Sequence, residues 1–233
     1  MVSLTIDNRT VAIEQRATIL EAARKVEIHI PTLCYHEALT PYGACRICTV
    51  EIVRERGSQL VASCIFPVEN NLIVHTNSEA VLKARRLLVE LLLARAPGAK
   101  NIQQLAQQLG IQEPRFEKED EDCILCGLCV RVCKEIVGIN AISLINRGKK
   151  KEVRPPFNVF SDVCVICGTC MTICPTGARK LEKLERDRIV HSRKDEAKMW
   201  DCKVCADSLL NPLFLSDEQY QHIVSDTEQI KED

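Results

Sequence analysis

The sequence predicts an α+β protein made of two small domains, a helical linker between them and a charged tail. Strand-like and helix-like segments alternate over residues 1–77, a run of cysteines recurs between Cys123 and Cys174, and charged residues crowd residues 181–233. A chain of 233 residues is long enough for two or three such units.

Residues 1–77 are predicted to form a β-grasp domain, a small sheet that curls around one helix. Apolar and polar residues alternate over 4–6 and again over 11–13, with Asp7-Asn8 between them, which is typical of a β-hairpin. Thr18 and Glu21 have the spacing of a capping box and predict a helix that ends near Val26. Further strands are expected at 49–53, 60–63 and 72–75.

Residues 78–115 are predicted to form a helical linker. The segment from Thr76 to Glu79 resembles another capping box, and the helix behind it should run to about Arg95. Helical spacing assigns its buried face to Val81, Leu82, Leu88, Leu91 and Leu92, and its polar side to Arg85 and Arg86. A shorter helix is expected over 101–109, ended by Gly110.

Composition limits the classes of function. The net charge of -1 gives no reason to expect nucleic-acid binding, and the most apolar stretch, Leu87 to Ala94, contains Glu90 and is far shorter than a membrane span. Fourteen cysteines in a chain without a secretion signal suggest a reducing, cytoplasmic location, where clustered thiols bind metals rather than form disulfides. We therefore expect no nucleic acid, no membrane insertion and a metal-binding role.

The strongest motif is a repeat, residues 116–180 forming the predicted second domain. The pattern C-x2-C-x2-C-x3-C occurs twice, a run typical of bacterial ferredoxins with [4Fe–4S] clusters. The first run is Cys123, Cys126, Cys129 and Cys133, and the second is Cys164, Cys167, Cys170 and Cys174. Gly127 and Gly168 are expected to let the backbone approach the cluster.

The fourth cysteine of each run is expected to serve the other cluster, as in two-cluster ferredoxins. One [4Fe–4S] ligand set is then Cys123, Cys126, Cys129 and Cys174, and the other is Cys164, Cys167, Cys170 and Cys133. Structural zinc is the alternative for four-cysteine sites. Two complete repeats favour iron.

A third ligand set precedes these two. Cys34, Cys45, Cys48 and Cys64 are spaced as C-x10-C-x2-C-x15-C, with a longer first loop than plant-type [2Fe–2S] ferredoxins have. The spacing fits one [2Fe–2S] cluster in a loop against the β-grasp sheet, with Arg46 beside it to offset the cluster's charge. Zinc is again the alternative.

The segments Gly43–Glu51 and Cys64–Thr76, followed by both ferredoxin runs, resemble one known family across residues 1–180. It comprises the iron–sulfur diaphorase subunits of NAD-reducing hydrogenases and the N-terminal parts of the large iron–sulfur subunit of NADH dehydrogenase, of iron-only hydrogenases and of NAD-linked formate dehydrogenases. The resemblance implies a non-catalytic electron-transfer subunit of an NAD(P)H-dependent complex. FMN and NAD(P) are expected only on a flavin-containing partner subunit, and a terminal redox enzyme is the other expected partner.

The chain departs from that family in one respect. Most members carry a cluster bound by one histidine and three cysteines between the two domains, but the segment 87–109 contains neither residue type. The alternatives to this assignment are the iron–sulfur subunit of a succinate dehydrogenase or fumarate reductase, and a zinc-stapled scaffold protein. Complete cysteine runs argue against the former, because such subunits usually lack one cysteine of a run.

Cys202 and Cys205 form half of a four-ligand site in the tail. His191 and His222 could complete a zinc site, a partner could supply the missing ligands, or the two thiols are structural. No G-x-G pattern and no nucleophile–base arrangement occurs, so the sequence predicts redox centres without a substrate site.

Overall fold

The computed structural model describes residues 1–55, 57–155, 164 and 167–178. The chain divides into two compact units, Met1–Gly127 and a second that begins at Leu128. The predicted tail and its cysteine pair, Cys202 and Cys205, lie outside the described residues. The described helices include none that is both long and apolar enough to cross a membrane.

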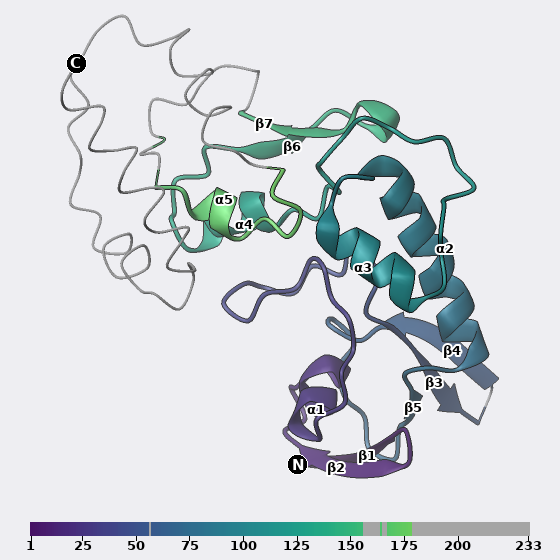
Figure 1. The fold of residues 1–233 in the computed structure, drawn as a ribbon. Helices are drawn as coiled ribbons and strands as arrows, with labels where there is room; N and C mark the ends of the chain where they lie inside the picture. Colours follow the sequence, from purple (N-terminus) through teal and green to yellow (C-terminus); the bar gives the residue numbers. More distant parts are fainter. Residues whose placement is uncertain (56, 156–163, 165–166, 179–233) are drawn as a thin grey trace, which may run out of the picture. The chain divides into compact units, whose positions relative to one another are not determined.

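A five-stranded mixed sheet forms the base of the first unit (Figure 1). Two strands form a hairpin, β1 (Val2–Ile6) and β2 (Arg9–Ile13). Another antiparallel pair consists of β3 (Thr49–Arg54) and β4 (Gly57–Ala62), and β5 (Ile73–His75) lies between the two pairs. β5 pairs in parallel with β1 and antiparallel with β3, which gives the order β2-β1-β5-β3-β4. The predicted strands are thus all present.

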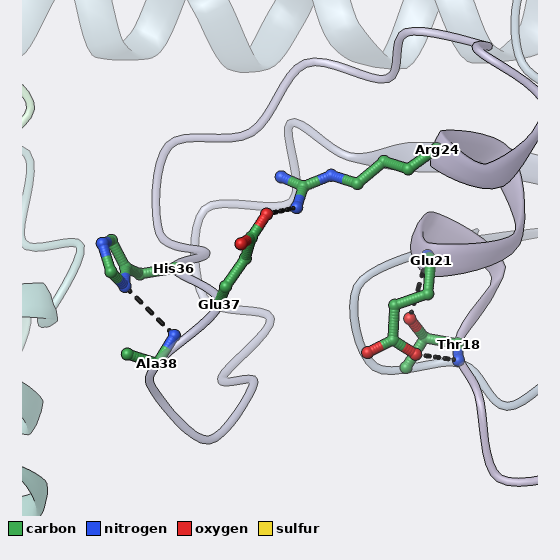
Figure 2. A network of polar contacts seen from close by, with 6 residues as sticks. All are labelled: Thr18, Glu21, Arg24, His36, Glu37 and Ala38. Carbon is green, nitrogen blue, oxygen red and sulfur yellow. Dashed lines mark hydrogen bonds and ion pairs between the residues drawn. The ribbon is translucent and has the colours of Figure 1, made fainter. Parts of the chain in front are cut away.

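The helix α1 (Ile19–Lys25) supplies the other half of the core. Both hydrogen bonds of the predicted capping box are present, between the side chain of Thr18 and the amide of Glu21 and between the side chain of Glu21 and the amide of Thr18 (Figure 2). The apolar side chains Ile19 and Leu20 are fully buried against the sheet. This arrangement of one helix on a mixed sheet confirms the predicted β-grasp.

Two further helices complete the first unit. α2 (Glu79–Arg95) packs against β3, and α3 (Lys100–Gln108) lies alongside α2 (Figure 1). The predicted cap of α2 was wrong, because Ser78 accepts the amide of Val81 and the hydroxyl of Thr76 instead donates to Asp7.

The predicted buried face of α2 was also partly wrong. Its buried positions are Val81, Arg85, Val89, Leu93 and Ala94, whereas Leu91 is 45% exposed. The buried residues follow steps of four from Val81, so the face that meets the rest of the unit is rotated relative to the run of leucines. Arg85, predicted on the polar side, lies at the centre of the buried face.

The second unit contains short elements. These are α4 (Leu128–Glu135), the hairpin of β6 (Ser143–Ile145) and β7 (Glu152–Arg154) around a 3-10 turn at Gly148–Lys150, and α5 (Thr169–Thr172). α4 packs against α5. Each of these two helices carries the third cysteine of one run, Cys129 or Cys170.

Candidate iron–sulfur sites

The four cysteines of the first unit come together from three loops. Cys34 follows α1, Cys45 and Cys48 lie in the loop that leads into β3, and Cys64 follows β4. Three of the four side chains are about 1% exposed, and Cys45 is partly exposed. No disulfide joins any of the twelve cysteines that the structure describes.

These four thiols form two pairs. Cys34 and Cys45 interact through their side chains, and the amide of Cys45 also donates to Sγ of Cys34 at 3.4 Å. Cys48 and Cys64 form the other pair, and the interaction with Cys64 lowers the pKa of the Cys48 thiol to about 6. A hydrogen bond to the paired sulfur raises the pKa of Cys45 and of Cys64, and burial and the negative charge of neighbouring thiolates raise it further.

This donor set fits a two-iron cluster. Each iron of a [2Fe–2S] cluster takes two protein ligands, so two adjacent pairs of thiols match its needs. The positive charge of the irons would also remove the repulsion that four neighbouring thiolates would otherwise suffer. Among the described residues, no group of three or more His, Cys, Asp or Glu is arranged around a single metal ion.

The loop that holds Cys45 and Cys48 depends on close backbone contacts. Gly43 has a φ of +66°, and a Cβ at this position would lie 2.7 Å from Cδ1 of Ile65. The conformation favours glycine, and any larger residue would also require the side chain of Ile65 to move. The carbonyl of Cys48 accepts the amide and the hydroxyl of Ser63, which join the loop to the segment that carries Cys64.

The loop that follows Cys34 contacts α1 through Arg24 (Figure 2). Arg24 pairs with Glu37, and its guanidinium carbon lies 4.8 Å from the centre of the Tyr35 ring. Nδ1 of His36 accepts the amide of Ala38 at 3.2 Å, which fixes the turn just after Cys34. The helix therefore positions the first cysteine of the set.

Arg85 is the functional residue that sequence reasoning placed wrongly. Its side chain donates to the carbonyls of Ile47 and Thr49, the two residues that flank Cys48. Arg46, which the sequence suggested for offsetting charge, is exposed on the loop. The spacing of four residues that places Arg85 on the same face as Val81 and Val89 could have indicated its burial. A charged residue on an amphipathic helix is, however, normally assigned to the solvent-facing side.

The same helix also contacts the first cysteine of the ferredoxin repeats. Nε of Arg95 donates to the carbonyl of Cys123 at 2.7 Å, and Nη1 of Arg95 pairs with Glu119 at 3.0 Å. Arg85 and Arg95 are ten residues apart, which corresponds to about 15 Å along a helix axis. α2 therefore links the Cys48 loop to Cys123 within the first unit.

The two ferredoxin runs share a positive φ at one glycine each. Gly127 and Gly168, each just after the second cysteine of its run, have φ values of +74° and +71°. Nothing lies within 4 Å of a Cβ built on Gly168, so there the conformation rather than the space requires glycine.

Local donors point at several of the sulfurs. The amide of Leu125 donates to Sγ of Cys123 at 3.4 Å, and the amide of Ala141 to Sγ of Cys133 at 3.3 Å. The hydroxyl of Thr169 donates to Sγ of Cys167 at 3.3 Å. Donors of this kind stabilise the negative charge of iron-bound thiolates.

Comparison with known protein families defines the class of protein. Residues 1–79 match a family described as a 2Fe-2S iron-sulfur cluster binding domain, and residues 122–178 match a 4Fe-4S dicluster domain. The chain is thus an iron–sulfur protein with a [2Fe–2S] domain followed by a [4Fe–4S] dicluster domain.

Individual relatives narrow this class. The chain is 36% identical over 189 residues to NADP-reducing hydrogenase subunit HndD of Solidesulfovibrio fructosivorans, which covers 68% of this chain and 32% of that protein. It is 36% identical over 174 residues to NADPH-Fe(3+) oxidoreductase subunit alpha of Geobacter sulfurreducens, covering 64% and 20%. For the NADH-ubiquinone oxidoreductase 75 kDa subunit of Reclinomonas americana, identity is 34% over 178 residues, covering 66% and 26%.

A solved structure agrees with these relatives. A chain in the crystal structure of NAD+-reducing [NiFe]-hydrogenase in the H2-reduced state matches with a TM-score of 0.65 and 28% identity, covering 76% of this chain and 86% of that one. The resemblance predicted from the sequence, to iron–sulfur subunits of NAD(P)-linked hydrogenases and NADH dehydrogenases, is confirmed. The chain spans about a fifth to a third of the length of the curated relatives it matches.

Proposed function

We propose that this chain is the electron-transfer subunit of a cytoplasmic NAD(P)H-linked oxidoreductase complex. It would relay single electrons between a flavin-containing NAD(P)H-oxidising subunit and a terminal redox enzyme such as a hydrogenase or a formate dehydrogenase. The observation that carries the proposal is that two adjacent pairs of thiols lie in the β-grasp unit and that a [4Fe–4S] dicluster domain follows in the same chain.

Three ligand sets would hold the clusters. Cys34 and Cys45 would bind one iron of the [2Fe–2S] cluster, and Cys48 and Cys64 the other. For the [4Fe–4S] clusters we keep the exchanged sets, in which Cys174 completes the first run and Cys133 completes the second. The packing of α4 against α5 supports this exchange, because each fourth cysteine lies one helical turn beyond the third.

A partner with a flavin follows from the chemistry of nicotinamides. A hydride carries two electrons, whereas an iron–sulfur cluster accepts one at a time, so a flavin must divide the pair. The three relatives named above are all subunits of NAD(P)-linked enzymes by their names. This chain would carry electrons through its iron–sulfur clusters, and the partner would supply the nicotinamide site.

We propose that α2 takes the place of the histidine–cysteine cluster that most members of the family carry between the two domains. Within the first unit, α2 contacts both the Cys48 loop through Arg85 and Cys123 through Arg95, and these contacts support a path without an intermediate centre. Arg115 pairs with Glu90 on the same helix and further secures the segment that leads to Cys123. Direct electron transfer past α2 would then replace the missing step.

Metal analysis of the anaerobically purified full chain tests the ligand sets. We expect about ten irons per chain and no stoichiometric zinc, from one [2Fe–2S] and two [4Fe–4S] clusters. The C202S/C205S double variant should keep that iron count, since two thiolates cannot complete a site. Zinc in place of iron would overturn the redox function, and a count near six would remove one [4Fe–4S] cluster.

Activity measurements test the partner. The pure chain should not reduce a viologen dye with NADH, and turnover should appear when the co-purifying flavin subunit is added. Sustained turnover by the flavin-free chain would contradict the relay assignment.

A further inference from the structure

Arg85 is a buried cation beside the candidate [2Fe–2S] site. Its side chain is 4% exposed, in a stripe with Val81 and Val89. Charged side chains are almost never fully buried unless they are paired, because removing a charge from water is costly. The surroundings of Arg85 must therefore compensate its charge.

The hydrogen bonds of Arg85 reach two segments, residues 47–49 and residues 76–77. Nε donates to the carbonyl of Ile47 at 3.1 Å, and Nη2 donates to the carbonyls of Thr49 at 2.8 Å and Thr76 at 3.2 Å. Nη1 donates to Oδ1 of Asn77 at 3.4 Å. Two of these carbonyls belong to the residues on either side of Cys48, so Arg85 holds the backbone of that cysteine on both sides.

None of these acceptors carries a charge. The ion pairs found in the described part of the chain do not include Arg85. Burial lowers the pKa of the Arg85 guanidinium, and negative charge on Cys48 opposes that change. Arginine nevertheless stays protonated, because its ordinary pKa is far above neutrality.

We propose that Arg85 is a positioning residue that compensates the charge of the [2Fe–2S] cluster and raises its reduction potential. This inference rests on the proposed function, since it requires the cluster at Cys34, Cys45, Cys48 and Cys64. A reduced cluster carries one more negative charge than an oxidised one. A fixed buried cation next to Cys48 therefore stabilises the reduced form more strongly.

Burial makes this effect specific to Arg85. An exposed cation such as Arg46 is screened by water and salt, so it affects the potential weakly. Arg86 offers a matched control on the next position of α2. It is exposed, and its Nε donates to the carbonyl of Leu109 in the first unit, away from the cysteine loop.

The test uses the full chain purified anaerobically with its clusters, as wild type, R85M, R85K and R86M. Iron and sulfide assays establish that the [2Fe–2S] cluster is present, and a redox titration followed by EPR measures its reduction. In R85M we expect the ratio of reduced to oxidised cluster at a fixed potential to fall about tenfold, or 59 mV for a one-electron couple. R85K keeps the positive charge and should therefore stay within about threefold of wild type, and R86M should match wild type.

The outcomes separate the two proposals. A wild-type chain without a [2Fe–2S] signal would overturn the proposed function and this inference with it. An intact cluster in R85M with the same potential as in R86M would overturn only the role of Arg85. If R85M assembles no [2Fe–2S] cluster, R85K decides: a cluster near the wild-type potential supports the need for positive charge, and loss of the cluster contradicts it.

Discussion

The two units hold their cysteines by different means. In the first unit, Cys48 and Cys64 belong to a continuous apolar core that also contains Ile52, Val74 and the buried face of α1. In the described residues from Leu128 onward, the large aliphatic side chains that are buried are Leu128, Val132 and Ile142. From this difference we expect the first ligand set to lie on a scaffold that folds by its own apolar core, and the other two sets to contribute to the folding of their unit.

The difference has an energetic basis. Full burial of a large aliphatic side chain contributes about 1.5–3 kcal/mol, so a core with many such residues offsets the entropy of ordering the chain. The few in the described part of the second unit do not. We therefore expect the free energy of cluster binding to become folding free energy in this unit, as in small metal-dependent domains.

The largest expected effect is that of removing iron. Chelation under anaerobic conditions should abolish amide protection over residues 128–155 and 167–178, because the clusters supply most of the stability there. The strands β1 to β5 should keep much of their protection. Hydrogen exchange with mass spectrometry measures both regions, and equal protection before and after chelation would break the comparison.

Loss of a single ligand should have the next largest effect. If the ligand sets are exchanged, Cys174→Ser should damage the cluster held by Cys123, Cys126 and Cys129 and leave the other [4Fe–4S] cluster largely intact. EPR spectra with iron counts separate the two, and Cys202→Ser is the control with no expected loss. Selective damage to the cluster of Cys164, Cys167 and Cys170 would show that the sets are not exchanged.

A substitution in the core of the β-grasp should have a smaller but still measurable effect on the free energy of unfolding. Ile52→Ala, at a fully buried position of β3, should lower the free energy of unfolding of this unit by about 2–5 kcal/mol. Ile73→Ala on the neighbouring β5, at a position 44% exposed, should cost less than about 1 kcal/mol. Denaturant titration of the metal-free chain measures both. Equal effects would mean that the apolar core does not hold this unit without iron.

The smallest expected effect is that of one helix cap. Thr18→Ala removes the side-chain half of the capping box of α1 and should cost about 1 kcal/mol. Thr10→Ala, exposed on the edge strand β2, is the control with a smaller expected effect. A loss of this size should leave α1 folded and the loop that follows Cys34 anchored, so the iron content should not change. Loss of the [2Fe–2S] cluster would show that the scaffold is weaker than we infer.

Local patterns predicted most of the described fold. The hairpin, the capping box at Thr18 and the end of the second linker helix before Gly110 depend on residues close in sequence, and all are observed. The predicted start and buried face of α2 failed for a common reason. Asp7 engages Thr76 and β3 packs against the helix, and both partners are distant in sequence.

The sequence by itself predicted which residues would carry the chemistry. The spacing of cysteines within a run reflects the reach of one loop around one cluster, so C-x2-C-x2-C-x3-C can be read without any fold. For the same reason it indicated two domain types, which the family matches bear out. Only the tertiary structure decided how distant residues meet. The pairing of Cys34 with Cys45 and of Cys48 with Cys64, and the burial of Arg85 beneath Ile47 and Thr49, depend on contacts between segments far apart in the chain, which no local pattern records.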